Sequence, residues 1–203
     1  MDKLWIEFIY FADDDIDSAK IQMAGNGSTG HVAVCCQQAI EKYFKSHLVK
    51  HGWELSKTHD LLHLHREIEN IQSWNLDKKL LADLNGVYID DRYPGSIGTM
   101  PDGLMPSEEK VQRYFELAQE VETVFKKLNI TGVDDIKEII AHNYSIELDS
   151  EKIASINEAI NSGKIEPYQA YNAVIKEIRE TRRRSRRDKN GNNTQRNDGA
   201  GLQ

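Results

Sequence analysis

The sequence predicts an all-α protein: an antiparallel, up-and-down helical bundle followed by a C-terminal helical extension and a disordered basic tail. Two observations lead to this fold class. Apolar residues recur at three- and four-residue steps through most of the chain, which is the pattern of one buried face on an amphipathic helix. No segment alternates β-branched and polar residues in the way that a half-buried strand does.

Five helices are predicted in the first part of the chain. Gly52 suits the end of the second helix, and Thr58 is a natural N-cap for the third. Pro94 ends the fourth because proline cannot continue a helix. Ser107, followed by two glutamates, opens the fifth. These helices cover residues 4–24, 31–52, 59–71, 76–92 and 107–128.

Three shorter helices are predicted in the extension. Pro167 favours the first turn of the last one. From Asn190 onward the chain is polar, glycine-rich and without periodicity, which is typical of disorder. The three helices cover residues 133–144, 150–163 and 167–180. We therefore expect three regions: a bundle over 1–128, a small helical extension over 129–178, and a basic, disordered tail over 179–203.

The composition is that of a soluble globular protein, with 39% hydrophobic and 29% charged residues. No apolar run approaches the roughly 20 residues needed to cross a bilayer, and no secretory signal is visible, so we expect no membrane segment. Cys35 and Cys36 are adjacent in an amphipathic segment, which favours buried, reduced thiols and a cytoplasmic location. The net charge of −7 is uneven: residues 179–203 hold eight basic and three acidic side chains, so residues 1–178 carry −12.

The segment GNGSTG, residues 25–30, matches the Gly-x-Gly-x-x-Gly pattern of a dinucleotide-binding loop. That loop works between a strand and a helix, because the strand delivers the chain to the pyrophosphate at the helix N-terminus. Here a helix is predicted before the glycines, and no parallel sheet is predicted anywhere. We therefore interpret the segment as a helix–helix turn and expect no cofactor.

Four segments, in order, resemble motifs of the HEPN (higher eukaryotes and prokaryotes nucleotide-binding) domain family. Residues 12–19 are similar to its A-x-x-D-L-x-x-A helix, and residues 92–94 to its Arg-Tyr-Pro. The other two are Gln38, Ala39, Glu41, Lys42 and Lys45, which match Q-A-x-E-K-x-x-K, and Thr58, His59, Asp60, Leu61 and Leu64, which match T-H-D-L-x-x-L. The resemblance covers about residues 5–128 and implies an up-and-down bundle that is usually a homodimer.

The resemblance also implies a setting for the protein. Many members lie beside a separate nucleotidyltransferase or in toxin–antitoxin and antiviral systems, and some cut RNA without metal. That cleavage uses an Arg-x(4–6)-His motif, in which the histidine moves protons and the arginine stabilises the phosphate. No histidine stands at the required distance after Arg66, Arg92 or Arg113. Whether the protein is an enzyme is therefore left open.

A substitute for that motif is Lys137, His142 and Tyr144, which mimic the R-x(4)-H-x-Y of a HEPN toxin subgroup. Lysine keeps the charge but lacks the planar fork of arginine. If an enzyme is built here, it is a metal-independent endoribonuclease. The alternative is an exposed histidine and a packed tyrosine on a short helix.

The predicted ligand-binding residues are Arg92 and Tyr93, with Lys42 and Lys45 as added positive charge. An arginine at a helix end before a proline-fixed loop can present its guanidinium to a phosphate. The alternative is an internal ion pair with Asp90 or Asp91, and two lysines that are merely solvated.

The basic tail is a second candidate binding segment, because arginine-rich segments bind phosphate backbones without sequence choice. Its alternative partner is an acidic protein surface, including that of the chain itself. The arginines concerned are Arg182, Arg183, Arg184, Arg186 and Arg187.

No metal site is expected. His59 and His63 stand four residues apart, as in a zinc-binding helix, but a third ligand is lacking because His65 points to another side. The leading hypothesis is a HEPN-like homodimer that binds a nucleotide or a nucleic-acid phosphate. The alternatives are the metal-independent ribonuclease and a non-catalytic protein-interaction scaffold.

Overall fold

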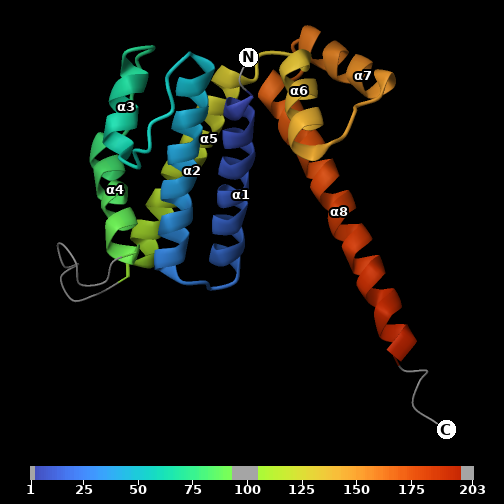
Figure 1. Ribbon diagram of the computed structural model, residues 1–203, viewed down its shortest axis with the longest axis horizontal. Coiled ribbons are helices and arrows are strands. Elements are labelled where there is room, and N and C mark those ends of the chain that lie inside the picture. Colours follow the sequence, from blue (N-terminus) through green and yellow to red (C-terminus); the bar gives the residue numbers. More distant parts are fainter. Residues whose placement is uncertain (1–2, 93–104, 198–203) are drawn as a thin grey trace. The chain divides into compact units, whose positions relative to one another are not determined.

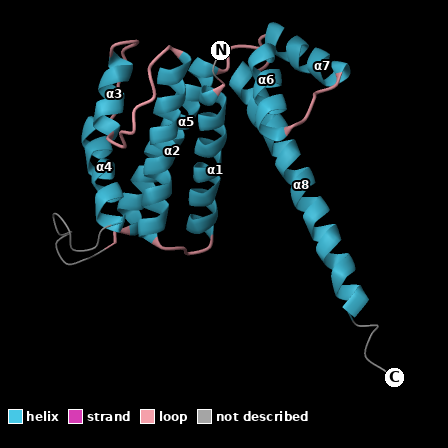
Figure 2. Ribbon diagram, viewed as in Figure 1, coloured by secondary structure: helices cyan, strands magenta, loops and turns pink. Residues whose placement is uncertain are grey.

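A computed structural model describes residues 3–92 and 105–197, with side chains for residues 3–87 and 105–185 (Figure 1). Every regular element in these residues is a helix, as predicted (Figure 2). The helices are α1 (Leu4–Ala24), α2 (Thr29–Lys50), α3 (Leu61–Glu69), α4 (Lys78–Arg92), α5 (Glu108–Asn129), α6 (Val133–Tyr144), α7 (Ser150–Asn161) and α8 (Pro167–Asn197). None of these helices combines the length and hydropathy that a bilayer-spanning segment requires.

The chain forms two compact units, residues 1–129 and residues 130–203. The first unit holds α1 to α5 and the second holds α6 to α8. In the first unit α2 is central, because it packs against α1, α3, α4 and α5 (Figure 1). Residues 25–28 reverse the chain between α1 and α2, whereas residues 51–60 lead it back along α2, so that α3 runs in the same direction as α2 and α4 in the opposite one (Figure 1). The five helices form the predicted helical bundle.

The central position of α2 explains why fifteen of its 22 residues are buried. Apolar side chains fill most of this surface, and an aromatic group closes one end of the core. The rings of Phe44, Trp74 and Phe125 contact one another, with centroids 5.3–6.1 Å apart. The remaining buried residues of α2 are polar, so they need partners inside the unit.

The turn between α1 and α2 is residues 25–28, which lie inside GNGSTG. The backbone N–H of Gly27 donates to the carbonyl oxygen of Gln22 at 2.7 Å. A Cβ atom on Gly27 would lie 2.9 Å from that oxygen, so only glycine fits this close approach. The glycine pattern is thus explained by a helix–helix turn.

The start of α3 differs from the prediction. Thr58 was expected to be the N-cap, but Asp60 occupies that position: its Oδ1 accepts from the backbone N–H groups of Leu62 at 2.9 Å and His63 at 3.2 Å. The Thr58 hydroxyl instead accepts from the N–H of Asp60 at 3.2 Å. An aspartate within reach of two helical N–H groups is favoured at this position because its negative charge also suits the helix dipole. His59 consequently lies outside the helix.

A buried ionic group ties α1, α2 and α5 together. The Nζ atom of Lys126 lies 2.9 Å from Asp13 Oδ1 and 2.8 Å from Glu122 Oε1, and the Tyr43 hydroxyl donates to Asp13 at 2.6 Å. Burial works to lower the pKa of Lys126, but the two carboxylates outweigh it and raise that pKa above its ordinary value. Lys126 is therefore a charged residue inside the core.

In the second unit α6, α7 and α8 pack against one another around Ile140, Ile156 and Tyr171. Helix α8 runs to residue 197, beyond the range 167–180 that was predicted for the last helix. Arginine is a good helix former, and the packed first half of α8 supplies the nucleus from which a helix propagates.

Candidate functional site

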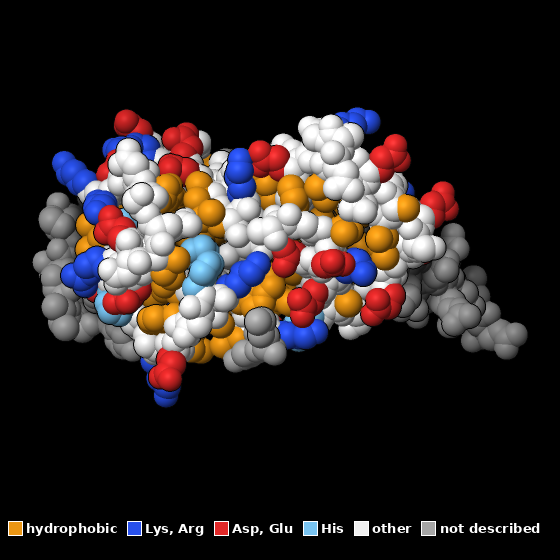
Figure 3. Space-filling model, turned by 90° about the horizontal axis from the view of Figure 1, so that it is seen from above, with side chains coloured by type: hydrophobic (Ala, Val, Ile, Leu, Met, Phe, Trp, Pro, Cys, Tyr) orange, Lys and Arg blue, Asp and Glu red, His pale blue; other side chains and the backbone are white. Residues whose placement is uncertain are grey.

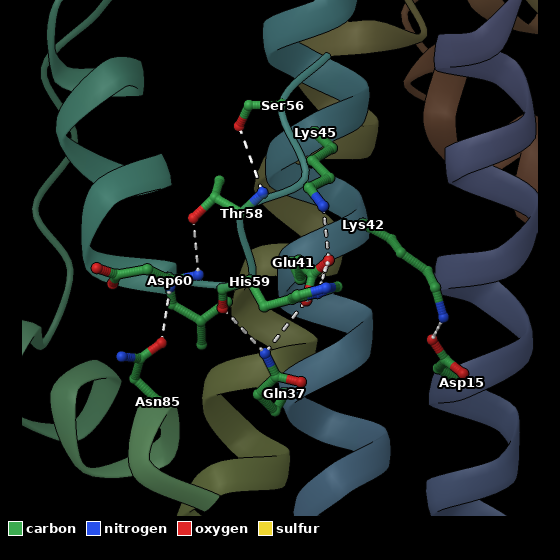
Figure 4. Close-up of polar contacts among 11 residues, drawn as sticks. Asp15, Gln37, Glu41, Lys42, Lys45, Ser56, Thr58, His59, Asp60 and Asn85 are labelled. Carbon is green, nitrogen blue, oxygen red and sulfur yellow. Dashed lines mark hydrogen bonds and ion pairs between the residues drawn. The ribbon is translucent and has the colours of Figure 1, made fainter. Parts of the chain in front are cut away.

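Four polar residues form a cluster where the segment before α3 crosses α2 (Figure 4). We call Gln37, Glu41, Lys45 and His59 the Glu41 cluster. The Glu41 carboxylate accepts from Lys45 Nζ at 2.8 Å, from His59 Nδ1 at 3.0 Å and from Gln37 Nε2 at 3.3 Å. Because a carboxylate only accepts, the hydrogen bond to His59 places the proton on Nδ1.

The spacing along α2 creates this cluster. Gln37, Glu41 and Lys45 stand four residues apart, so they lie on one face of the helix. That face meets the segment leading into α3, where Gln37 Nε2 also lies 3.4 Å from the carbonyl oxygen of His59. The segment is held from its other side by α4, since Asn85 accepts from the N–H of Leu61 at 2.8 Å (Figure 4).

Burial differs sharply within the Glu41 cluster. The side chains of Glu41 and Lys45 are 9% and 7% exposed, whereas the side chain of His59 is 46% exposed. A carboxylate that holds Nδ1–H fixes the tautomer and orientation of the imidazole, which makes Nε2 the basic nitrogen. Such a pair can accept a proton from a substrate hydroxyl.

The sequence assigned Glu41 and His59 to two different family motifs, but did not join them into a site. Gln37 was not singled out at all. The spacing Gln37, Glu41, Lys45 was visible in the sequence. The sequence did not show that these residues form a site, because His59, which completes the cluster, comes from another part of the chain.

Both lysines of the predicted ligand set are held by carboxylates. Lys45 pairs with Glu41, and Lys42 forms an ion pair with Asp15 of α1 (Figure 4). Burial raises the pKa of Asp15, and the contact with Lys42 works against that rise. The charges of Lys42 and Lys45 are thus largely neutralised by carboxylates within the bundle.

The other two residues of that set are placed only in part. Helix α4 ends at Arg92, as the following proline predicted. The side chain of Arg92 and all of Tyr93 lie outside the described residues.

The structure does not bring Lys137, His142 and Tyr144 together. All three belong to α6, but five residues of helix place Lys137 and His142 about 140° apart around the axis. Lys137 is exposed and lies 3.4 Å from Asp134. Tyr144 is 4% exposed, and the guanidinium of Arg182 lies over its ring at 5.3 Å.

The arginines of the predicted tail belong to α8. We call residues 179–187 the arginine segment. Arg182 is anchored, because its Nη2 donates to the carbonyl oxygen of Tyr144 at 2.9 Å. Arg183 and Arg184 are exposed, and within the described residues neither forms an ion pair. The backbones of Arg186 and Arg187 continue the helix, and their side chains lie outside the described residues.

Charges of both signs mix on the face shown in Figure 3, where lysine and arginine side chains lie beside acidic ones. The arginine segment is different, since residues 182–187 hold five arginines and no acidic residue. In the part of the chain that the structure describes, no group of histidine, cysteine, aspartate and glutamate side chains is placed to hold a metal ion. His59 and His63 do not share a helix, because α3 begins after His59.

Comparison with known families matches the HEPN domain to residues 6–128, which is more than half of the chain. The chain belongs to the HEPN domain family. This membership places the protein, at the family level, among nucleotide- or RNA-related proteins. It covers α1 to α5 and thus includes the Glu41 cluster, but neither α6 nor the arginine segment. No curated protein and no solved structure matches the chain.

Proposed function

We propose that this HEPN protein binds RNA through the arginine segment of α8. The observation that carries the proposal is the exposure of Arg183 and Arg184 on a helix whose neighbouring residue, Arg182, is fixed to α6. One guanidinium group can donate to two phosphate oxygens at once. Several arginines in succession can therefore bind a phosphate backbone without recognising its sequence. Membership of the HEPN family favours RNA as the source of those phosphates.

The acidic composition of the first unit supports the same assignment. Residues 1–129 contain 21 acidic and 14 basic side chains. A surface of net negative charge repels nucleic acid, so phosphate binding is expected where positive charge is concentrated. Arg92, with Tyr93 beside it, remains a proposed second contact for a nucleotide or an RNA phosphate. Lys42 and Lys45 contribute less, because each already neutralises a carboxylate.

A binding assay tests the proposal. The fluorescence anisotropy of a labelled single-stranded RNA is measured with the wild type, with R183A/R184A and with the control K137A/K164A. The control removes the same charge from exposed positions of the same unit. We expect weaker binding for R183A/R184A and wild-type binding for the control. Equal affinities for all three proteins would contradict the proposal, and no RNA binding at all would favour the scaffold.

We also propose that the protein acts as a homodimer through the outer face of α1. Phe11 and Ile21 on this helix are 51% and 62% exposed, and the ring of Phe11 meets that of Tyr10 edge-on. Exposed large apolar side chains of this kind are typical of interaction surfaces. Light scattering on the purified protein should give a dimer mass, and F11E/I21E should give a monomer. A monomeric wild type at assay concentrations would contradict the dimer.

The proposed setting is a cytoplasmic toxin–antitoxin or defence module with a separate nucleotidyltransferase as partner. Both cysteines are free and buried, and burial raises the pKa of Cys36 to about 12, so this thiol stays protonated and unreactive. A reducing compartment fits such cysteines. An adjacent nucleotidyltransferase gene would support the partner.

A further inference from the structure

The arginine segment belongs to a part of α8 that apolar packing does not support. The buried apolar side chains of α8 end at Ile175, and Ile178 is the last apolar residue of the helix. Most helices in proteins owe their stability to a packed apolar face. The five arginines of residues 182–187 also place like charges three and four residues apart, which destabilises a helix. Neither apolar packing nor charge thus accounts for the helical state of this segment.

Arg182 connects the arginine segment to another helix. Its Nη2 atom donates to the carbonyl oxygen of Tyr144 at 2.9 Å, and its guanidinium carbon lies 5.3 Å from the centroid of the Tyr144 ring. Tyr144 is the last residue of α6, where carbonyl groups lack helical partners and the helix dipole favours a positive charge. The tyrosine is only 4% exposed, so packing holds its ring in place. One side chain therefore joins α8 to the end of α6.

We infer that Arg182 is a positioning residue for RNA binding. It holds the arginine segment as a helix before RNA arrives, and its own guanidinium does not contact the RNA. The inference rests on the RNA binding proposed above and lies entirely within the second unit. It separates Arg182, which is engaged with α6, from Arg183 and Arg184, which are exposed.

Helical geometry supports this division of roles. Successive residues of an α-helix are about 100° apart around its axis, so Arg182 lies on the same side of α8 as Ile175 and Ile178. Arg183 and Arg184 are turned away from Arg182 by about 100° and 200°. They can therefore meet a phosphate backbone that approaches from solvent while Arg182 stays on α6. A segment that is already ordered loses less free energy on binding, because RNA does not have to order it.

The charge-conserving variant R182K tests the inference in the RNA-binding assay. Lysine keeps the positive charge but lacks the planar guanidinium that donates to the carbonyl oxygen and lies over the ring. We expect binding about tenfold weaker, which is the order of one charged hydrogen bond and one cation–π contact at a partly exposed site. The matched control R183K makes the same exchange at an exposed residue. It should bind within about twofold of the wild type, because lysine also neutralises a phosphate.

Two further measurements distinguish positioning from direct contact. Backbone amides of residues 183–187 should exchange hydrogen more slowly in the free wild type than in free R182K, and bound RNA should remove the difference. R182Q should bind RNA more weakly than the wild type but with the same dependence of the association constant on salt. Loss of a direct phosphate contact would instead make the logarithmic slope about 0.7 less steep.

The outcomes separate this inference from the RNA-binding proposal. Wild-type affinity in R182K, together with weaker binding by R183A/R184A, would overturn the role of Arg182 and leave RNA binding by the arginine segment standing. A less steep slope in R182Q would make Arg182 a phosphate contact and would also overturn its positioning role. Equal hydrogen exchange in free R182K and free wild type would show that Arg182 does not order the segment. A wild type that does not bind RNA would overturn both proposals.

Discussion

Replacing Lys126 by methionine should lower the free energy of unfolding of the first unit by about 3–5 kcal/mol, because it leaves a buried carboxylate without this cation. The side chains of Lys126 and Asp13 are 4% and 3% exposed, and their charged atoms are 2.9 Å apart. Methionine fills nearly the same volume, so little of the loss comes from a cavity. For a unit of this size the loss corresponds to a fall in Tm on the order of 10–20 °C.

Tryptophan fluorescence during urea unfolding measures this effect in the right unit, since all three tryptophans precede residue 130. The control is K127M, which removes the neighbouring exposed lysine and should change stability by less than about 0.5 kcal/mol. D13N/K126M should be less destabilised than the sum of its single variants, because the charges interact directly. A K126M variant as stable as K127M would refute the reasoning that Lys126 is a charged core residue.

Three further predictions concern the same unit. Burial lowers the pKa of both His47 and His65 in the folded protein. In the unfolded chain these histidines take up protons near their ordinary pKa of about 6.5, so the free energy of unfolding should fall as the pH drops through and below that value. Equal urea midpoints at pH 7.5 and 5.5 would contradict this. Replacing Asp60 by alanine removes the cap of α3 and should cost about 0.5–2 kcal/mol in urea unfolding, whereas an unchanged midpoint would argue against the cap. Gly27→Ala brings a Cβ atom to 2.9 Å from the carbonyl oxygen of Gln22 and should lower the free energy of unfolding by about 1–3 kcal/mol, as measured by urea unfolding. An unchanged free energy of unfolding would show that the turn relaxes without cost.

The helices could be predicted from the sequence because their signals are local. The bounds of α1 and α6 agree with the predicted ranges, since apolar spacing and the flanking glycines define both. The N-cap residue of α3 was harder to predict. Thr58 and Asp60 are both good caps, and only the three-dimensional path of the segment decides which carbonyl and side chain meet the helical N–H groups.

The polar interior could not be predicted because its partners are far apart in sequence. Lys126 lies 113 positions from Asp13, and His59 lies 18 positions from Glu41. Periodicity assigned Lys45 to a helix but could not show that the lysine is buried against Glu41 rather than solvated. A charged residue on a central helix has neighbours on all sides, so its environment depends on the packing of four other helices.

Salt dependence of RNA binding tests the central claim most directly. The logarithm of the association constant falls linearly with the logarithm of the salt concentration, with a slope of about −0.7 for each phosphate contact to single-stranded RNA. If Arg183 and Arg184 each hold a phosphate, R183A/R184A should bind with a slope about 1.4 less steep than that of the wild type. Identical slopes for the two proteins, or wild-type binding that does not respond to salt, would contradict RNA recognition by the arginine segment.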